Sequence, residues 1–356
     1  MIQKMGNNSM IFEKPPVILA ASSVVGEKEG QGPLGQYFDH VETDPKFGME
    51  TWEQAESTMQ LMAAEKAIKK AGLSKEQLDF LFAGDLLGQL IATSFGLIEL
   101  ERPVFGVYGA CSTIGESLLL ASMALCGGAG NYALAVTSSH FAGAEKQFRF
   151  PLPYGNQRPL SATWTVVGSG AVIVAAEDKK DKAMAKITGG TPGRIIDFGV
   201  KDSMNMGACM APAACDTICQ HLKDFNRQPT DYDAIITGDL GKIGQQILLK
   251  LVKEKGYDIS DRHLDCGMLI FDPESQDTHA GGSGCGCSAV TLAAYLLPKI
   301  NRGEWQRILF VPTGALLSTV SFNEGQSVPG IAHGVVIENR GYHQSGNRQR
   351  ISGEIA

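Results

Sequence analysis

The sequence lacks a basic excess, a long apolar run and an apolar segment at its N-terminus. Its 356 residues carry a formal net charge of −7, so no basic block can neutralise phosphates, and nucleic acid is not expected as the main partner. The longest apolar runs reach only about ten residues, roughly half of what a bilayer-spanning helix needs. Residues 1–10 have no apolar core of a signal peptide, which favours a reducing, cytosol-like compartment.

Paired cysteine spacings are also missing. The eight cysteines form no CxxC pair, so neither a zinc site nor another metal centre is expected. Cys285 and Cys287 make a lone CxC, a weak metal signal that close packing at a helix start explains better. The glycine-rich residues 281–284 are not followed by a Lys-Ser or Lys-Thr pair, so they do not indicate a nucleotide-binding loop.

The sequence does contain a cysteine at the start of an apolar helix. Cys111 stands among small residues in segment 107–117, and residues 118–125 continue as helix formers. The free N–H groups and the positive dipole end of a helix start favour a thiolate or another anion. Three roles are therefore open for Cys111: a nucleophile, a ligand-site residue, or a buried core residue.

The chain has the pattern of a tandem duplication. Residues 234–240 match residues 80–86 nearly position for position, and both segments hold an Asp after an apolar strand. Aligning the two apolar helices that follow places Ser283 opposite Cys111. A match of this length predicts two copies of one strand–helix–strand–helix–strand unit.

The repeat predicts the domain organisation. We expect an N-terminal half at 12–182, a C-terminal half at 185–340, and loose polar tails at 1–11 and 341–356. Apolar strands that alternate with helices indicate helices packed on mainly parallel sheets. Two such halves, joined face to face, predict an α/β protein with five layers, α/β/α/β/α.

Four segments carry a resemblance to a known family: 107–113, 140–155, 279–286 and 321–331. Through them, and over nearly its whole length, the chain resembles the stage V sporulation protein AD family of spore-forming bacteria. That family is part of the thiolase-like superfamily, which also holds thiolases and ketoacyl synthases. The resemblance implies the duplicated five-layered thiolase-like fold.

The resemblance also implies a function. It implies a spore protein that binds dipicolinic acid (pyridine-2,6-dicarboxylate), free or with calcium, and that needs no other cofactor. It further implies a place in a membrane channel complex that carries dipicolinate into the developing spore. The expected partners are integral membrane subunits of the same operon and a second copy of the chain, because thiolase-like proteins are usually dimers. The expected location is peripheral, on the inner membrane of the forespore.

The chain departs from the condensing enzymes of the superfamily at two positions. Those enzymes pair the cysteine with His/His or His/Asn partners that activate it and stabilise the oxyanion. Here Asp239 stands where a His belongs, and Ser283 stands where the initiating ketoacyl synthases carry Asn. An Asp disfavours a neighbouring thiolate, and a Ser is no general base at neutral pH. We therefore expect no catalytic residues and no enzyme activity.

The expected ligand site combines the helix starts with basic side chains. Cys111, Asp239 and Ser283 are predicted to line it, although Asp239 could be a mere turn former, as its counterpart Asp85 is expected to be. A dicarboxylate needs compensating charge, which Arg supplies as a planar fork. Basic candidates lie on the irregular stretch that follows residue 139, and each could instead be solvated: His140, Lys146, Arg149 and Arg158.

Two other functions stay open. An acyl-transferring enzyme of the thiolase or ketoacyl-synthase type would use Cys111 with an unorthodox partner. A purely structural subunit of a membrane complex would be recruited by its partners and would bind no small molecule.

Overall fold

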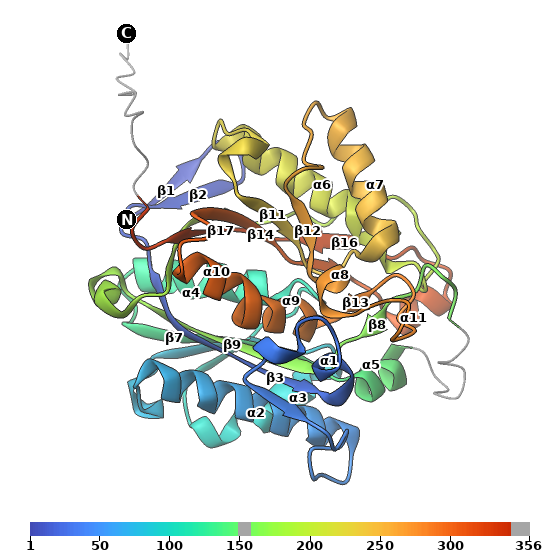
Figure 1. Ribbon diagram of the computed structural model, residues 1–356, viewed down its shortest axis with the longest axis horizontal. Coiled ribbons are helices and arrows are strands. Elements are labelled where there is room, and N and C mark those ends of the chain that lie inside the picture. The colour runs from blue at the N-terminus through green and yellow to red at the C-terminus, as the bar shows by residue number, and fades with distance from the viewer. Residues whose placement is uncertain (149–157, 343–356) are drawn as a thin grey trace.

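The computed structural model describes residues 1–148 and 158–342, and their helices and strands form five layers (Figure 1). The strands are β1 (Ile2–Met5), β2 (Ser9–Phe12), β3 (Val17–Gly26), β4 (His40–Glu42), β5 (Phe80–Gly84), β6 (Val104–Gly106), β7 (Tyr132–Ser139), β8 (Trp164–Thr165), β9 (Gly168–Ala175), β10 (Ala185–Thr191), β11 (Ala234–Thr237), β12 (His263–Asp265), β13 (Gly282–Ser283), β14 (Arg307–Val311), β15 (Thr313–Ala315), β16 (Gly330–Ala332) and β17 (Gly334–Asn339). The helices are α1 (Glu27–Gly30), α2 (Trp52–Ala71), α3 (Ile91–Gly96), α4 (Thr113–Cys126), α5 (Phe141–Phe148), α6 (Met206–Asp224), α7 (Gly241–Glu254), α8 (Cys266–Ile270), α9 (Cys285–Thr291), α10 (Leu297–Asn301) and α11 (Thr319–Asn323).

The order of the layers is visible in Figure 1. Helices α2 and α3 cover one sheet, α4, α9 and α10 lie between the two sheets, and α6 and α7 cover the other sheet. The expected α/β/α/β/α body is therefore present. Its two internal helices, α4 and α9, are the ones that the sequence places after Cys111 and Ser283.

The sheet order shows the duplication. Among the described residues, the strands run β12-β11-β14-β17-β10 in one half and β3-β9-β7-β5-β6 in the other, and a short β10–β3 pairing joins the halves. The two orders mirror each other, so that β5 corresponds to β11, β7 to β14 and β9 to β17. The parallel order expected of alternating strands and helices occurs in the outer three strands of each half. Antiparallel pairs join these strands to the centre.

The hydrophobic cores lie between the layers. The largest packs α4 and α9 against both sheets, with Ile114, Leu118 and Val290 fully buried. Two further cores lie under α2 on one side and under α6 on the other. Burying one such leucine contributes about 1.5–3 kcal/mol, so the central helices are held firmly between the sheets.

Glycine sets how closely α9 approaches its sheet. A Cβ on Gly170 of β9 would lie 2.4 Å from the carbonyl carbon of Ala289. A Cβ on Gly286 would lie 2.2 Å from the carbonyl oxygen of Gly168. No side chain fits at these contacts, and the close approach brings the start of α9 to the ends of β7 and β9.

Some local predictions are confirmed and others are wrong. Thr51 and Gln54 form the capping box of α2, and Gly72 ends that helix at a φ of 69°. Residues 1–11 are not a loose tail, because β1 and β2 form a hairpin that pairs with β10, and Asp224 accepts the N–H groups of its turn. The other predicted tail lies almost wholly outside the described residues.

One helix contains a proline, and one predicted irregular stretch is helical. Helix α6 starts at Met206, capped by the Asn205 side chain, and Pro212 lies inside it. Residues 141–148 form α5 rather than an irregular stretch. Within the described ranges, the structure contains no helix that combines the length and apolarity of a membrane span.

Candidate functional site

Two helix starts, one from each half, meet between the sheets. Cys111 lies two residues before the first residue of α4, and Ser283 lies two residues before that of α9. The Cys285 thiol donates to the carbonyl oxygen of Ala110 at 3.0 Å and ties the two starts together. Cys111 and Ser283, which the repeat predicts to be counterparts, therefore lie close together in the fold.

Both turns that precede these helices have unusual backbone conformations. Ala110 has a φ of 50°, a left-handed value that is uncommon for a residue with a Cβ. Gly284 has a φ of 107°, and a Cβ there would lie 2.6 Å from the Ser139 hydroxyl oxygen. The side chains that follow and precede these turns, Cys111 and Ser283, line one shared cavity.

Asp239 joins this site from the end of β11. Its carboxylate accepts hydrogen bonds from the Thr313 hydroxyl at 2.7 Å and from the Gly284 N–H at 3.1 Å, and it bonds the Cys111 thiol. Burial raises the pKa of Asp239 to about 7, although these three partners lower it. The carboxyl group therefore keeps its proton to a much higher pH than an exposed aspartate does.

Cys111 is held as a neutral thiol. Its pKa is raised well above the ordinary value, first by burial and then by the nearby Asp239 and Cys285. The N–H of Gly284 opposes this effect without reversing it. A thiol with a raised pKa is a weak nucleophile, because the thiolate is the reactive form.

Ser283 is buried and accepts a hydrogen bond from the Thr163 hydroxyl at 2.9 Å. Its remaining capacity is one O–H donor, whose direction rotates with the hydroxyl, and one acceptor lone pair. Ser283 can therefore bind an acceptor atom of a ligand, but no neighbouring group turns it into a base.

The site consists of two cavities in series. The inner one, bounded by Cys111, Ser283 and Ala144, has a volume of about 20 Å³. That space holds about one water molecule. The outer one measures about 410 Å³, opens toward the start of α11, and shares Tyr108 and Phe148 with the inner cavity. The inner cavity is therefore too small for an organic molecule, whereas the outer cavity has room for one.

The predicted basic residues lie elsewhere. The Lys146 ammonium pairs with Glu53 at 2.8 Å on an exposed surface. The Arg158 guanidinium bonds Asp277 at 3.0 Å and lies 4.8 Å from the ring centroid of Trp164.

His140, whose pKa is lowered by burial, faces the Pro45 carbonyl at 2.8 Å in a separate aromatic-lined pocket. Arg149 lies outside the described residues. Among the residues that the structure describes, no Lys or Arg lines either cavity near Cys111.

Two residues of the site were not predicted from the sequence. Thr313 bonds Asp239. The strand registers of the two halves make it the counterpart of Ser138 in β7, so the repeat could have indicated it. Tyr108 lines both cavities, and its position three residues before Cys111 is the only signal for it.

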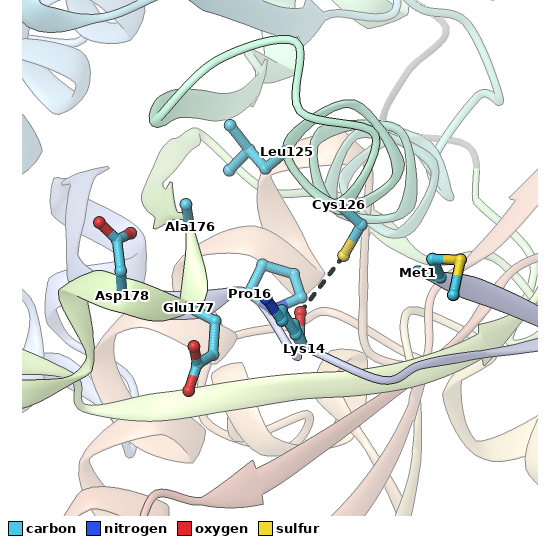
Figure 2. A pocket seen from close by; sticks show the side chains of 8 residues that line it. All are labelled: Met1, Lys14, Pro16, Leu125, Cys126, Ala176, Glu177 and Asp178. Atoms are coloured by element: carbon cyan, nitrogen blue, oxygen red, sulfur yellow. Dashed lines mark hydrogen bonds between the residues drawn. The ribbon is translucent and has the colours of Figure 1, made fainter.

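Another hollow lies at the opposite end of α4 (Figure 2). It measures about 240 Å³, and the Cys126 thiol donates there to the Lys14 carbonyl at 3.5 Å. Cys126 is separated from Cys111 by most of α4, a helix of about 20 Å at 1.5 Å per residue. This hollow therefore does not belong to the Cys111 site.

The chain is similar to known proteins in sequence and in fold. A model of the stage V sporulation protein AD family matches residues 6–338. The stage V sporulation protein AD of Bacillus subtilis (strain 168) is 43% identical over 336 residues, which cover 94% of this chain and 98% of that relative.

Solved structures of the thiolase-like fold also match. The human mitochondrial 3-ketoacyl-CoA thiolase in complex with CoA superposes with a TM-score of 0.58 at 15% identity, covering 92% of this chain and 99% of that one. The 3-oxoacyl-[acyl-carrier-protein] synthase III of Aquifex aeolicus VF5 gives 0.55 at 14% identity, covering 91% and 99%. These likenesses confirm the predicted thiolase-like fold.

Proposed function

The chain belongs to the stage V sporulation protein AD family, and we propose that it is a non-catalytic binding protein for dipicolinic acid. In this role it supports uptake of dipicolinate into the developing spore as a peripheral subunit of a membrane channel complex. Its partners there are integral membrane subunits of the same operon.

The observation that carries the proposal is the setting of Cys111, which is buried and bonds Asp239 at the position where the condensing enzymes carry a base. The two helix starts and the inner cavity keep the framework of a thiolase-like site, yet burial and Asp239 raise the pKa of the thiol that would have to attack. The carboxyl of Asp239 stands beside it and makes the thiolate less favourable still. This combination favours binding over acyl transfer.

The lining of the cavities favours the calcium chelate as the bound form. Dipicolinate alone is a dianion, and burying an unpaired charge costs several kcal/mol. Neither cavity offers a cationic side chain from the described residues. A one-to-one calcium chelate is neutral, so it enters such a site without that penalty. We place its ring against Tyr108 in the outer cavity, with one edge toward Cys111, Asp239 and Ser283.

Calorimetry tests this proposal. Dipicolinate is titrated into the protein with and without Ca²⁺, and the tighter binding is expected with Ca²⁺. Cys111→Ala and Ser283→Ala should each weaken binding about tenfold, or 1.4 kcal/mol. Cys126→Ala, at the far end of α4, is the matched control and should change nothing. If no heat of binding appears up to millimolar ligand under either condition, the proposal is wrong.

An acyl-transferring enzyme is the second candidate. The left-handed Ala110 still turns the chain sharply before Cys111, and the Gly284 N–H still points at the thiol. Incubation with acyl-CoA followed by intact mass measurement discriminates between the two functions. An acyl adduct that Cys111→Ala abolishes would favour the enzyme.

We also propose that the chain forms a homodimer through β6. Within the described residues this strand pairs only with β5, so its other edge presents free N–H and C=O groups. Val104 and Phe105 are exposed on it. A bare apolar edge strand is a template for pairing with a second copy. Light scattering should show a dimer that Phe105→Lys dissociates.

The purely structural alternative makes a different prediction. A subunit of that kind would be recruited to membranes by its partners and would give no heat with dipicolinate in either condition.

A further inference from the structure

Two cysteines one helical turn apart on α6 form a dithiol. Cys215 and Cys219 are four residues apart, and their sulfur atoms lie 3.9 Å from each other. Both line a pocket of about 430 Å³ next to α6, in the helical layer that covers the second sheet (Figure 1). This pocket is separate from the Cys111 site and plays no part in the function proposed above.

The helix geometry disfavours a disulfide between them. A disulfide needs Cβ atoms about 3.5–4.5 Å apart. Residues four apart on a helix hold their Cβ atoms about 5–6 Å apart. Closing the S–S bond would therefore distort α6 next to Pro212, whereas the two sulfurs can share a bridging atom without moving the backbone.

The sulfur separation matches a bridging metal ion. With thiolate–metal bonds of about 2.3 Å, as found for zinc, one ion sets two sulfurs about 3.8 Å apart at a tetrahedral angle and about 4.6 Å apart in a line. The observed 3.9 Å lies near the tetrahedral value, and a near-linear two-coordinate ion needs the sulfurs about 0.7 Å further apart. Small rotations of the two side chains change the sulfur–sulfur distance by this amount.

The number of ligands decides which ion fits. Within residues 1–148 and 158–342, no group of three or more His, Cys, Asp or Glu side chains is arranged to hold a metal. A structural zinc site requires four ligands, so a bare cysteine pair does not satisfy Zn²⁺. Soft thiolate ligands select Cu(I), which accepts low coordination numbers.

The surroundings suit the charge of such a complex. A bis-thiolate complex of a monovalent cation carries a net charge of −1, and Lys223 and Lys255 line the same pocket. The Asp216 carboxylate also lines it but is occupied by Arg194, with one contact at 3.1 Å. The hydrogen bond from Cys219 lowers the pKa of Cys215 and raises that of Cys219, so Cys215 loses its proton first and Cys219 donates the remaining one to it.

We propose that Cys215 and Cys219 form a two-coordinate dithiolate site for a soft monovalent cation, Cu(I). On binding, the two thiols release two protons and two sulfur–copper bonds form. The ion enters and stays as Cu(I), so no electron is transferred. Ile196 and Leu251 form the apolar part of the pocket lining beside the two sulfurs.

An anaerobic competition experiment tests the site. The full-length protein is titrated with Cu(I) held by a chromophoric chelator, bathocuproine disulfonate. We expect one equivalent of Cu(I) to be withdrawn per chain. Cys215→Ser and Cys219→Ser should each weaken binding about 100-fold, because each removes one of only two metal–sulfur bonds. Cys209→Ser, on the same helix but outside this pocket, is the matched control and should bind as the wild type does.

A second measurement covers the case in which a serine variant is destabilised. Phenylarsine oxide bridges only neighbouring thiols, so intact mass should show one adduct on the wild type and on Cys209→Ser, and none on Cys215→Ser. Three results would overturn the proposal: tight Cu(I) binding that survives in the double variant, absence of competition by the wild type, or formation of a Cys215–Cys219 disulfide by hydrogen peroxide in a protein that retains no Cu(I).

Discussion

Asp85 and Asp239 occupy matching positions in the two halves, yet their side chains have different partners. Asp85 follows β5 and accepts hydrogen bonds from the Leu87 N–H at 2.7 Å and from both the N–H and the hydroxyl of Thr93. All of these donors belong to its own loop. Asp239 follows β11 and instead bonds Thr313, Gly284 and Cys111, which come from three distant segments.

A third carboxylate explains the difference. In the second half, the N–H groups of Leu240 and Gly241, directly after Asp239, donate to Asp265 at 2.9 and 3.0 Å. Asp265 comes from the end of β12 and also accepts from Thr237 and Met268. Because Asp265 accepts the N–H groups of this loop, the Asp239 carboxyl can bond Cys111 of the other half. The repeat therefore fixes the position of an aspartate, and a distant residue decides its role.

Removing Asp265 should have the largest effect. Asp265→Ala leaves the buried N–H groups of Leu240 and Gly241 without an acceptor and also removes a partner of the Thr237 hydroxyl and the Met268 N–H. Each buried donor without an acceptor costs about 1–3 kcal/mol, so we expect a loss of roughly 3–6 kcal/mol in the free energy of unfolding. Asp239→Ala should cost only about 1–2 kcal/mol, because it removes the acceptor of a single backbone donor, the Gly284 N–H, and the Thr313 hydroxyl can rotate to another acceptor. Urea unfolding of both variants measures the difference. Equal losses would contradict the view that Asp265, and not Asp239, holds the loop.

The pH dependence of stability should separate Asp239 from the rest of the chain. Its folded-state pKa of about 7 lies above its ordinary value near 4, so the folded state keeps a proton that the unfolded chain releases. That contribution to stability is complete below pH 4 and is lost as the pH rises through 7. Between pH 5 and 8 the wild type should therefore lose about 2–3 kcal/mol relative to Asp239→Asn.

Urea midpoints of both proteins at the two pH values provide the measurement for Asp239. Glu29, whose pKa burial also raises to about 7, titrates in both proteins and cancels in the difference. A constant difference across this range would show that the Asp239 carboxyl titrates normally.

Much of the framework could be predicted from the sequence because it depends on local patterns. The match of 234–240 to 80–86 located both aspartates, and the alignment of the two apolar helices brought Ser283 to Cys111. Capping by Thr51 and the helix end at Gly72 are equally local features.

The rest depends on contacts between distant segments. Nothing near Asp239 in the sequence shows that Asp265 satisfies the loop after β11, so the two aspartates could not be told apart. The hairpin at residues 1–11 is polar, and its pairing with β10 follows from an edge that only the folded second half provides. Lys146 and Arg158 look like ligands for a carboxylate until their acidic partners, Glu53 and Asp277, come beside them.

Thiol reactivity should sharpen the contrast between the two aspartates at the site itself. Asp239 is one cause of the raised pKa of Cys111, after burial, whereas Asp85 is not among its causes. Asp239→Asn should therefore speed the reaction of Cys111 with methyl methanethiosulfonate at pH 8 about tenfold, which corresponds to one pKa unit. Asp85→Asn is the control and should leave the rate unchanged. The rates are followed by intact mass well below the unfolding temperature, and equal acceleration in both variants would point to loosened packing instead.

The smallest effect on stability is expected at Ala110, where the two helix starts differ in the residue type that precedes the helix. Ala110 adopts a φ of 50° before α4, while the second half places glycine, Gly284, before α9. Ala110→Gly relieves left-handed strain of about 1–2 kcal/mol but forfeits about 0.8 kcal/mol of buried methyl and about 0.4–1 kcal/mol through the freer unfolded chain. These terms nearly cancel, so the free energy of unfolding should change by less than about 1 kcal/mol. A urea titration that showed a loss above about 2 kcal/mol would mean that the Ala110 methyl group, packed with Cys111 and Cys285, stabilises the site more than its strained backbone costs.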